Sequence, residues 1–423
     1  MADELVVLLQ GARAGVVRQE RGELSFIYDE NWRQRADSYP LSLSMPLVKR
    51  QHGDAVVRAY LEGLLPDNES ILHAWALRFG VSARNPFSLL RHVGEDVAGA
   101  AQFVAPEGVE RAVRRGGRIE WIDEAQIAQR LRAIAEDHSA WRRSDDPGQF
   151  SLAGAQPKIA LYRVGDRWGV PSGATPTTHI LKPPTIGLDH FAENEHLCLQ
   201  LAQELEISAA SSEVMHFEDQ RAIVVERYDR ELVDGQVVRI HQEDMCQSAG
   251  VSPRTKYEAE AGPGVNQILH LLRQSSSAAP EDIDRFVAAL AFNWAIGGSD
   301  AHAKNYSVLM AAAQVRLAPL YDLVSLLPYP HVEIPRKIKL AMRIGGEYRI
   351  AYITRNHWER LARDNDLDPG RVVTGVSEVV TAVRDTVGRL VTNEAAGGLD
   401  PRFGDTFCSA VSTNAHRCQS ALR

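Results

Sequence analysis

The chain has 423 residues, of which 44% are hydrophobic and 24% charged; the composition is ordinary for folded proteins and the length predicts two or three domains. Its formal net charge of −8 argues against a surface that grips nucleic acid by itself, because such surfaces need clustered cations. Four scattered cysteines, an acidic beginning and the lack of a long apolar run argue against a disulfide framework, a secretory signal and a membrane span, so a cytoplasmic protein is expected.

The first hundred residues predict a small unit of strands and helices. Apolar and polar residues alternate around Leu5–Leu9 and again around Leu24–Tyr28, which is typical of short antiparallel strands. A helical stretch follows over 55–79, interrupted by Pro-Asp-Asn. We assign residues 1–107 to this unit and expect the arginine- and glycine-rich stretch 108–117 to be a linker.

Residues 118–230 predict a second, strand-rich part. Short apolar runs at 159–162 and 179–182 are separated by a region of glycine, proline and threonine, which indicates two strands. Apolar residues recur with helical spacing over 193–205, and 221–226 reads as a buried strand.

Residues 231–392 predict a mainly helical part. A helix is expected to begin at Pro280, with acids in its first turn, and to end at Gly297. A long amphipathic helix is expected around 372–390. The tail 393–423 is rich in glycine, alanine and serine, and we expect it to be flexible.

A short segment directly after Gly297-Gly298 suggests phosphoryl transfer. The sequence Asp-Ala-His-Ala-Lys-Asn begins at Asp300, and Asp322 follows after two expected strands. Transfer from a nucleotide needs a carboxylate that meets the attacking hydroxyl, and an amide that shares a metal with a second carboxylate. Asp300 is therefore the candidate acid/base, and Asn305 and Asp322 are candidate ligands of Mg²⁺, which prefers oxygen atoms. Lys304 would neutralise charge on the transferring group, and His302 is a further catalytic candidate, although such histidines are more often structural.

Upstream features occur in the order in which a kinase would place them. Lys182, at the end of an apolar strand, offers a positive charge for phosphates, and Glu195 on the following helix is its natural partner. Glu226 and Tyr228 follow a buried strand where a hinge would bind adenine. Before them lies a loop of small residues, whose backbone N–H groups can approach phosphate oxygens closely. Its candidate ATP-binding residues are Ala153, Gly154, Ala155, Gln156 and Lys158.

Each of these features alone has an ordinary structural explanation, such as a turn, a strand-edge lysine or a surface ion pair of little energy. Their joint order is what favours nucleotide chemistry.

Longer motifs extend this pattern along the chain. They are, in order, Ser151–Lys158, His179–Pro183, Asn194-Glu195, Val225–Arg230, Gln242–Gln247, Ser299–Ser307 and Leu320–Leu323. With these motifs the chain resembles the HipA serine/threonine kinase toxins of bacterial type II toxin–antitoxin systems, from the N-terminal unit to about residue 390.

The resemblance implies an α+β, protein-kinase-like bilobal fold, with an N-terminal α/β lobe that includes a small β-rich subdomain and an all-α C-terminal lobe. It implies that Asp300 is the catalytic acid/base, that Asn305 and Asp322 bind Mg²⁺, and that Lys182 contacts the phosphates of ATP. Ser151 falls on the serine that such kinases autophosphorylate. Adding about two negative charges there would eject the loop and inactivate the kinase.

The resemblance also implies partners. Family members phosphorylate an aminoacyl-tRNA synthetase and so arrest growth, and a small helix-turn-helix antitoxin of the HipB type neutralises them. That antitoxin carries most of the operator DNA contact, which would reconcile DNA association with an acidic chain. One departure is Pro157, where a polar or acidic residue is expected, because proline removes a backbone donor from the loop.

Two other functions stay open. Asp300, His302 and Asn305 also have the Asp-x-His-x-x-Asn spacing of aminoglycoside and choline kinases, which predicts a small-molecule phosphotransferase. An inactive, antitoxin-binding co-repressor is the third possibility, and the intact acidic and basic candidates argue against it. A metal hydrolase is less favoured because paired histidine ligands at helical spacing are missing.

Overall fold

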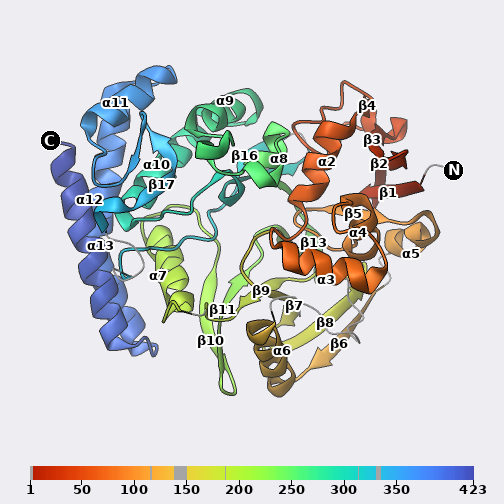
Figure 1. Ribbon diagram of the computed structural model, residues 1–423, viewed down its shortest axis with the longest axis horizontal. Helices are drawn as coiled ribbons and strands as arrows, with labels where there is room; N and C mark the ends of the chain where they lie inside the picture. Colours follow the sequence, from red (N-terminus) through yellow and green to blue (C-terminus); the bar gives the residue numbers. More distant parts are fainter. Residues whose placement is uncertain (1–2, 115–116, 138–149, 186, 313, 330–334) are drawn as a thin grey trace. The chain divides into compact units, whose positions relative to one another are not determined.

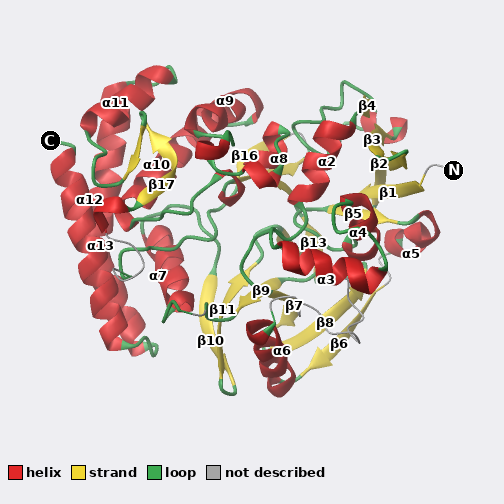
Figure 2. Ribbon diagram, viewed as in Figure 1, coloured by secondary structure: helices red, strands yellow, loops and turns green. Residues whose placement is uncertain are grey.

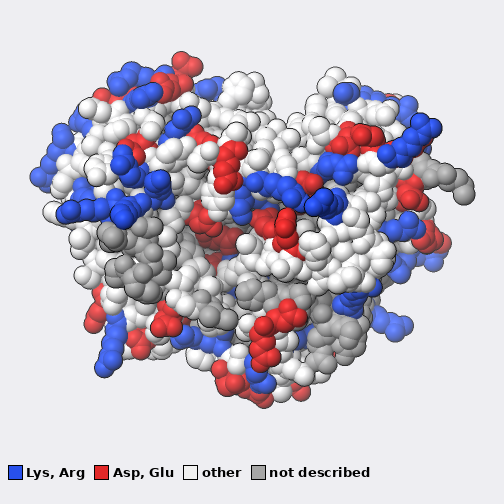
Figure 3. Space-filling view, in the orientation of Figure 1, with Lys and Arg blue, Asp and Glu red and all other residues white. Residues whose placement is uncertain are grey.

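The computed structural model describes residues 3–114, 117–137, 150–185, 187–312, 314–329 and 335–423 (Figure 1). The chain forms two compact units, each built from several segments. The first unit comprises Met1–Pro183, Met215–Arg254 and Val308–Val315; the second comprises Pro184–Val214, Thr255–Ser307 and Arg316–Arg423. The face shown in Figure 3 carries both acidic and basic side chains.

The N-terminal residues form an antiparallel five-stranded sheet in the order β4-β3-β2-β1-β5. Its strands are β1 (Asp3–Leu9), β2 (Ala12–Glu20), β3 (Glu23–Tyr28), β4 (Gln51–His52) and β5 (Ala101–Val104). The helices here are α1 (Glu30–Arg33), α2 (Asp54–Gly63), α3 (Glu69–Phe79) and α4 (Pro86–Val93). The expected strands and the interrupted helical stretch are confirmed. Alternate residues of β1 enter different clusters, since Val7 joins the main core whereas Val6 and Leu8 pack with Val104 and Ala112.

The expectation of a linker over 108–117 is wrong. A 3-10 turn (Pro106–Gly108) leads into helix α5 (Val109–Val113), whose buried Ala112 covers the back of the first sheet. Gly117 then begins strand β6 (Gly117–Ile122), which pairs with β8. Arg111, one of the arginines in this stretch, lies on the exposed side of α5 and pairs with Glu95.

A second sheet of six strands, in the order β10-β11-β9-β7-β8-β6, follows (Figure 2). Besides β6 its strands are β7 (Ile159–Val164), β8 (Arg167–Gly173), β9 (His179–Lys182), β10 (Ser212–Phe217) and β11 (Gln220–Glu226), and helix α6 (Glu124–Glu136) packs against β11. The predicted strands 159–162, 179–182 and 221–226 are confirmed. Smaller elements complete the region: the hairpin β12 (Arg230–Val233) and β13 (Gln236–Arg239), the sheet of β14 (His241–Asp244), β15 (Ser307–Ala311) and β16 (Gln314–Leu317), helix α8 (Met245–Ala249) and a 3-10 turn (Pro253–Thr255).

The second unit is predominantly helical, but it includes residues 184–214 and lacks 231–254, so its bounds differ from the predicted part 231–392. Its helices are α7 (Phe191–Glu204), α9 (Val265–Ser275), α10 (Ala279–Ile296), α11 (Arg355–Asp364), α12 (Pro369–Ala396) and α13 (Pro401–Ala421). The unit also contains one hairpin, formed by β17 (Lys339–Ile344) and β18 (Glu347–Arg349). It has 3-10 turns at Glu258–Glu260, Ala303–Asn305 and Pro335–Lys337. Helix α10 has proline in its first turn and ends at Gly297 with φ of 68°, so both of its predicted ends are confirmed. Among the described residues, every helix is too short or too polar to cross a bilayer.

The expectation of a flexible tail over 393–423 is wrong. Helix α12 continues to Ala396, and Asp400 caps α13 by accepting a hydrogen bond from the backbone N–H of Phe403 at 2.9 Å. Phe407 and Val411 lie on a buried face of α13 that packs against α12. Small residues suggested flexibility, but the apolar residues between them recur at helical spacing and bury one continuous stripe.

The motif Gln242–Gln247 has a structural role within the first unit. Asp244 caps α8 through the backbone N–H of Gln247 at 2.9 Å. The buried carboxylate of Glu243 accepts hydrogen bonds from the backbone N–H of Leu43 at 2.8 Å and from the Ser248 hydroxyl at 3.0 Å. Burial outweighs these bonds and raises the pKa of Glu243 to about 7.

This buried acid predicts a pH-dependent stability. Because the native pKa lies above the ordinary value of 4.5, the folded protein binds more protons, and the free energy of unfolding falls as pH rises from about 4.5 through 7. From pH 5 to pH 8, the free energy of unfolding of wild type should fall by about 2–3 kcal/mol relative to that of Glu243→Gln. Urea unfolding at both pH values measures this, with the exposed Glu260→Gln as the matched control. A difference between wild type and Glu243→Gln that is the same at pH 5 and pH 8 would contradict it.

Candidate active site

The segment that begins at Asp300 forms a tight turn directly after α10. The backbone N–H of His302 donates to the Asp300 carbonyl at 2.8 Å, and that of Asn305 donates to the His302 carbonyl at 2.9 Å. The side-chain Nδ2 of Asn305 also donates to the Asp300 carbonyl, at 3.0 Å. Since Nδ2 is the donor, Oδ1 of Asn305 keeps its lone pairs for another partner. The turn therefore fixes the amide relative to the backbone that carries the carboxylate.

Asp300 itself is exposed, whereas the neighbouring His302 is 4% exposed. The hydroxyl of Tyr257 donates to Oδ1 of Asp300 at 2.7 Å. The ring of Tyr257 also lies edge-on to the imidazole of His302, with centroids 5.0 Å apart. An exposed carboxylate is open to a large acceptor, whereas a buried imidazole suits a supporting role. Lys304, also predicted here, is 5% exposed in the same turn.

Asp322 lies in a segment that is tied to this turn. The Tyr321 hydroxyl donates to the carbonyl of Lys304 at 2.6 Å and forms a second hydrogen bond with the hydroxyl of Ser307, also at 2.6 Å. Asp322 has φ of 52°, a left-handed conformation that aspartate tolerates better than most residues but that still costs energy. Such strain is common where a side chain must point in one direction. Asn305 and Asp322 therefore belong to two segments joined by Tyr321.

Helix α7 is anchored to the same region. The side-chain amide of Asn194 accepts a hydrogen bond from the backbone N–H of Ser325 and donates to the carbonyl of Ser325, both at 2.9 Å. The next residue, Glu195, is 1% exposed. The sequence did not suggest a role for Asn194, Tyr257 or Tyr321, because their partners lie far along the chain.

In the first unit, the predicted phosphate loop is docked on the segment 64–67, which has the sequence Leu-Leu-Pro-Asp. The backbone N–H of Asp67 donates to the carbonyl of Gly154 at 3.1 Å. Gly154 has φ of 108°, a backbone conformation in which any other residue would be strained. Nζ of Lys158 donates to the carbonyl of Ala153 at 2.7 Å and closes the loop. Ala155 and Gln156 lie in the bend between these contacts.

Ser151 opens this loop and is fully buried. Its hydroxyl donates to the carbonyl of Leu64 at 2.8 Å, and its backbone N–H donates to the carbonyl of Asp96 at 2.9 Å. In this conformation the hydroxyl is closed off from solvent.

Lys182 is the last residue of β9, which lies between β7 and β11, and it is 5% exposed. It pairs with Ile223, whereas the exposed Glu226 pairs with His179 at the other end of β9. Three residue steps separate the two pairs, which corresponds to roughly 10 Å along the strands. An extended nucleotide can bridge such a span. The Tyr228 hydroxyl is hydrogen-bonded to Oε1 of Gln242.

A buried network of ions supports the segment after β11. Arg227 binds Asp229 through two bonds of 2.8 and 3.0 Å, and Arg230 and Arg239 each lie 3.0 Å from Asp96. All five side chains are at most 10% exposed. Burial raises the pKa of Asp96, but the charges of the arginines outweigh it and hold that pKa well below its ordinary value. The sequence did not predict this network.

The predicted residues thus fall into two groups. The first unit contains the loop 151–158, Lys182, Glu226 and Tyr228. The second unit contains Glu195, Asp300, His302, Lys304, Asn305 and Asp322. Within the described part of the chain, no three His, Cys, Asp or Glu side chains gather as a metal cluster. One carboxylate and one amide are still suited to Mg²⁺, which completes its coordination with water and phosphate oxygens.

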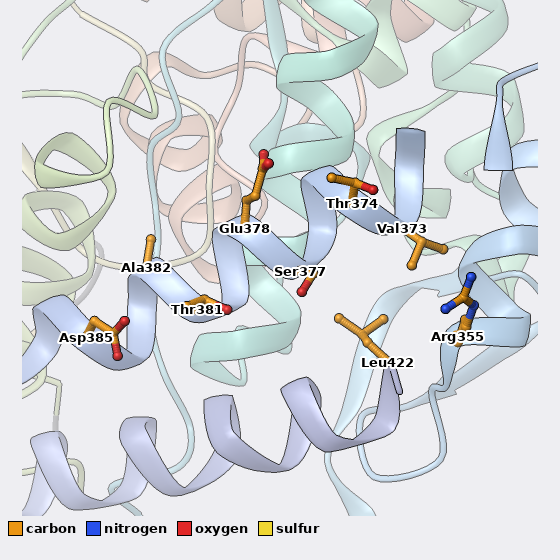
Figure 4. A pocket seen from close by; sticks show the side chains of 9 residues that line it. All are labelled: Arg355, Val373, Thr374, Ser377, Glu378, Thr381, Ala382, Asp385 and Leu422. Atoms are coloured by element: carbon orange, nitrogen blue, oxygen red, sulfur yellow. The ribbon is translucent and has the colours of Figure 1, made fainter. Parts of the chain in front are cut away.

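A surface depression of about 560 Å³ lies along α12 in the second unit (Figure 4). It is lined by Arg355, Val373, Thr374, Ser377, Glu378, Thr381, Ala382, Asp385 and Leu422. None of these is a predicted site residue, and they include no phosphate loop and no acid–amide pair. We therefore assign the depression no part in phosphoryl transfer.

Comparison with known proteins agrees with the resemblance. Residues 5–104 match the HipA N-terminal domain family, and residues 150–387 match the HipA-like C-terminal domain family. The chain is 33% identical over 416 residues to Y4mE of Sinorhizobium fredii, a protein named as a kinase, with 97% of each chain covered. It is 32% identical over 351 residues to the serine/threonine-protein kinase toxin HipA of Shewanella oneidensis, with 77% of each covered.

A solved structure agrees as well. HipA of Shewanella oneidensis MR-1, in complex with HipB and its operator DNA, has a TM-score of 0.82 and 25% sequence identity, with 98% of this chain and 97% of that chain covered. The predicted α+β, kinase-like fold is thereby confirmed. The chain belongs to the HipA family of kinases.

Proposed function

We propose that this chain is an ATP-dependent serine/threonine protein kinase and the toxin of a type II toxin–antitoxin module. It would arrest growth by phosphorylating a translation component, with an aminoacyl-tRNA synthetase as the expected target. The observation that carries the proposal is the turn at Asp300. There an exposed carboxylate and the amide of Asn305 are fixed within one turn, and Tyr321 ties the segment of Asp322 to it.

In this proposal the second unit carries the chemistry. Asp300 accepts or orients the proton of the acceptor hydroxyl, for which its exposure is required. The amide oxygen of Asn305 and the carboxylate of Asp322 would hold Mg²⁺, which shields the negative charge of the phosphates when bound. Lys304 supplies a positive charge next to the transferring group, and the buried ring of His302 packs against Tyr257.

The first unit would hold the nucleotide. Lys182 would bind the phosphates; Glu195, its expected partner, belongs to the second unit. The backbone of the docked loop 153–158, except at Pro157, would provide N–H groups for phosphate oxygens. Glu226 and Tyr228 would lie at the adenine end, roughly 10 Å along the strand from Lys182.

Removal of the Lys182 charge should weaken ATP binding. Because a hydrogen bond to a charged group contributes about 1.5–3 kcal/mol, Lys182→Met is expected to raise the dissociation constant for ATP about ten- to a hundredfold. Titration with a fluorescent ATP analogue measures this constant, and Lys339→Met, which removes an exposed lysine of β17, is the matched control. Equal affinity of Lys182→Met and wild type would remove Lys182 from the site.

Autophosphorylation of Ser151 would act as self-inactivation. Its hydroxyl is fully buried against the carbonyl of Leu64, where a phosphate of about two negative charges has no room and meets a repelling oxygen. Phosphorylation and the docked loop therefore exclude each other. Ser151 must leave its pocket to be modified, and the modified loop cannot return.

The expected partners follow from the Shewanella relative, whose structure contains HipB and operator DNA. We propose that a helix-turn-helix antitoxin of this type binds the chain and makes most of the DNA contact, since the chain itself has a net charge of −8.

Phosphoproteomics after expression without the antitoxin tests this function. The proposal expects growth arrest together with new serine or threonine phosphorylation on a translation component. Phosphate found on a small acceptor and on no protein would instead favour a phosphotransferase of the aminoglycoside or choline kinase type. Intact repression without any phosphorylation would favour the co-repressor.

A further inference from the structure

One contact of the candidate active site has no part in the chemistry described above. The hydroxyl of Tyr257 donates to Oδ1 of Asp300 at 2.7 Å, although the two residues lie 43 positions apart. A general base must come within about 2.6–3.2 Å of the group whose proton it takes. Tyr257 therefore binds the proposed base at the distance at which an acceptor hydroxyl would bind it. It either blocks that carboxylate or positions it.

The backbone around Tyr257 is fixed rather than mobile. The backbone N–H groups of Glu260 and Gly262 both donate to the carbonyl of Tyr257, each at 2.9 Å. A Cβ at Gly262 would lie 2.0 Å from the carbonyl oxygen of Thr255, so the turn closes tightly on glycine. A blocking residue would have to withdraw before each reaction, and this turn opposes withdrawal.

The next residue adds a second restraint. One carboxylate oxygen of Glu258 accepts a hydrogen bond from the backbone N–H of Arg343 at 2.7 Å, and the other lies 2.8 Å from Nε of the same arginine. The Glu258 side chain is 11% exposed, whereas that of Arg343 is 56% exposed, so the restraint rests on the bond to the backbone N–H more than on the ion pair. The segment that carries Tyr257 is thus held by its own turn and by the contact with Arg343.

The bond also leaves room for a substrate. An ionised carboxylate has two oxygens with about four lone-pair sites, and Tyr257 occupies one site on Oδ1. Oδ2 of Asp300 remains for the acceptor. The edge-on packing of the Tyr257 ring against buried His302 fixes the direction from which the hydroxyl reaches Asp300.

We infer that Tyr257 is a positioning residue for Asp300, which holds the exposed carboxylate in one orientation so that Oδ2 faces the acceptor hydroxyl. This inference rests on the proposed kinase function. Without the bond, an exposed aspartate samples several rotamers, and only a fraction of them is productive.

The test uses the full-length protein and measures the initial rate of γ-phosphoryl release from [γ-³²P]ATP to water and to the protein itself, at varied ATP concentration. Tyr257→Phe keeps the ring and removes the hydroxyl. We expect kcat to fall about tenfold while KM for ATP and the melting temperature stay unchanged. Tyr352→Phe, which removes the hydroxyl of an exposed tyrosine in the same unit, should have no effect.

A second comparison separates positioning from a general structural effect. If Tyr257 acts through Asp300, Tyr257→Phe has no further effect in an Asp300→Asn background. An unchanged or increased kcat in the single variant, or an additive loss in the double variant, overturns the inference. A wild-type protein that releases no phosphoryl group would instead overturn the proposed function, so the two failures are distinguishable.

Discussion

Replacement of Asp300 by asparagine is expected to reduce phosphoryl transfer by about 10²–10⁴-fold, the usual contribution of a positioned acid or base. Asparagine keeps the size of the side chain and can still accept the hydrogen bond from Tyr257. It cannot take the proton of the attacking hydroxyl. The fold and the affinity for ATP should therefore be retained, and kcat should change rather than KM.

Two measurements check this prediction. Incorporation of ³²P from ATP reports the chemistry, and growth after expression without the antitoxin reports toxicity. Asp405→Asn, an exposed aspartate of α13, is the matched control for the loss of one carboxylate. Growth arrest that is the same for Asp300→Asn and wild type would refute the role of Asp300. The location of the phosphate on protein or on a small acceptor then distinguishes the two kinase hypotheses.

The second large effect is expected from the buried network of ions. Asp96→Asn should lower the free energy of unfolding of the first unit by about 3–5 kcal/mol, because it leaves buried arginines without a counter-charge. Arg230 and Arg239 each lie 3.0 Å from Asp96, and the side chains of Arg230 and Asp96 are 2% and 4% exposed. The hydroxyl and the backbone N–H of Thr177 also donate to Asp96, at 2.7 and 3.0 Å. Each of these donors would lose a charged acceptor.

The prediction for Asp96 includes a dependence on pH. Its native pKa lies below the ordinary value of 3.8, so its stabilisation is complete above that value and is lost as pH falls below it. The free energies of unfolding of wild type and Asp96→Asn should therefore differ by a constant amount between pH 6 and 8. This difference should shrink as pH falls below about 3.8. Urea unfolding followed by tryptophan fluorescence measures the difference. Glu95→Gln, which breaks the neighbouring and more exposed pair with Arg111, is the control. A decrease in the free energy of unfolding of less than about 1 kcal/mol for Asp96→Asn would contradict the prediction and would show that the arginines find other partners.

Local signals account for what the sequence predicted well. The turn at Asp300 is closed by bonds within six residues, and the strands and helices of the core follow the periodicity of their apolar residues. The expected flexible tail and linker are wrong because small or charged residues in both stretches obscure the apolar residues that become buried. In α13, buried Phe407 and Val411 recur at helical spacing between small residues. In α5, Ala112 is buried against the first sheet although its neighbours are charged.

Long-range contacts explain what the sequence did not predict. Asp96 and Arg239 are 143 residues apart, and Asn194 and Ser325 are 131 apart. No local pattern indicates such a pair, because the sequence does not distinguish a buried arginine from an exposed one. A role for Tyr257 could have been suspected only from its place in a turn rich in glycine. Its hydrogen bond to Asp300, 43 residues away, is evident only in the folded chain.

The proposed kinase function requires that Asn305 and Asp322 hold Mg²⁺ and that Lys182 binds ATP. A crystal structure with Mg²⁺ and a non-hydrolysable ATP analogue tests this most directly. We expect a cation bound by Oδ1 of Asn305 and the carboxylate of Asp322, and a contact of Nζ of Lys182 with a nucleotide phosphate. A nucleotide bound without contact to any of these three side chains would contradict the account.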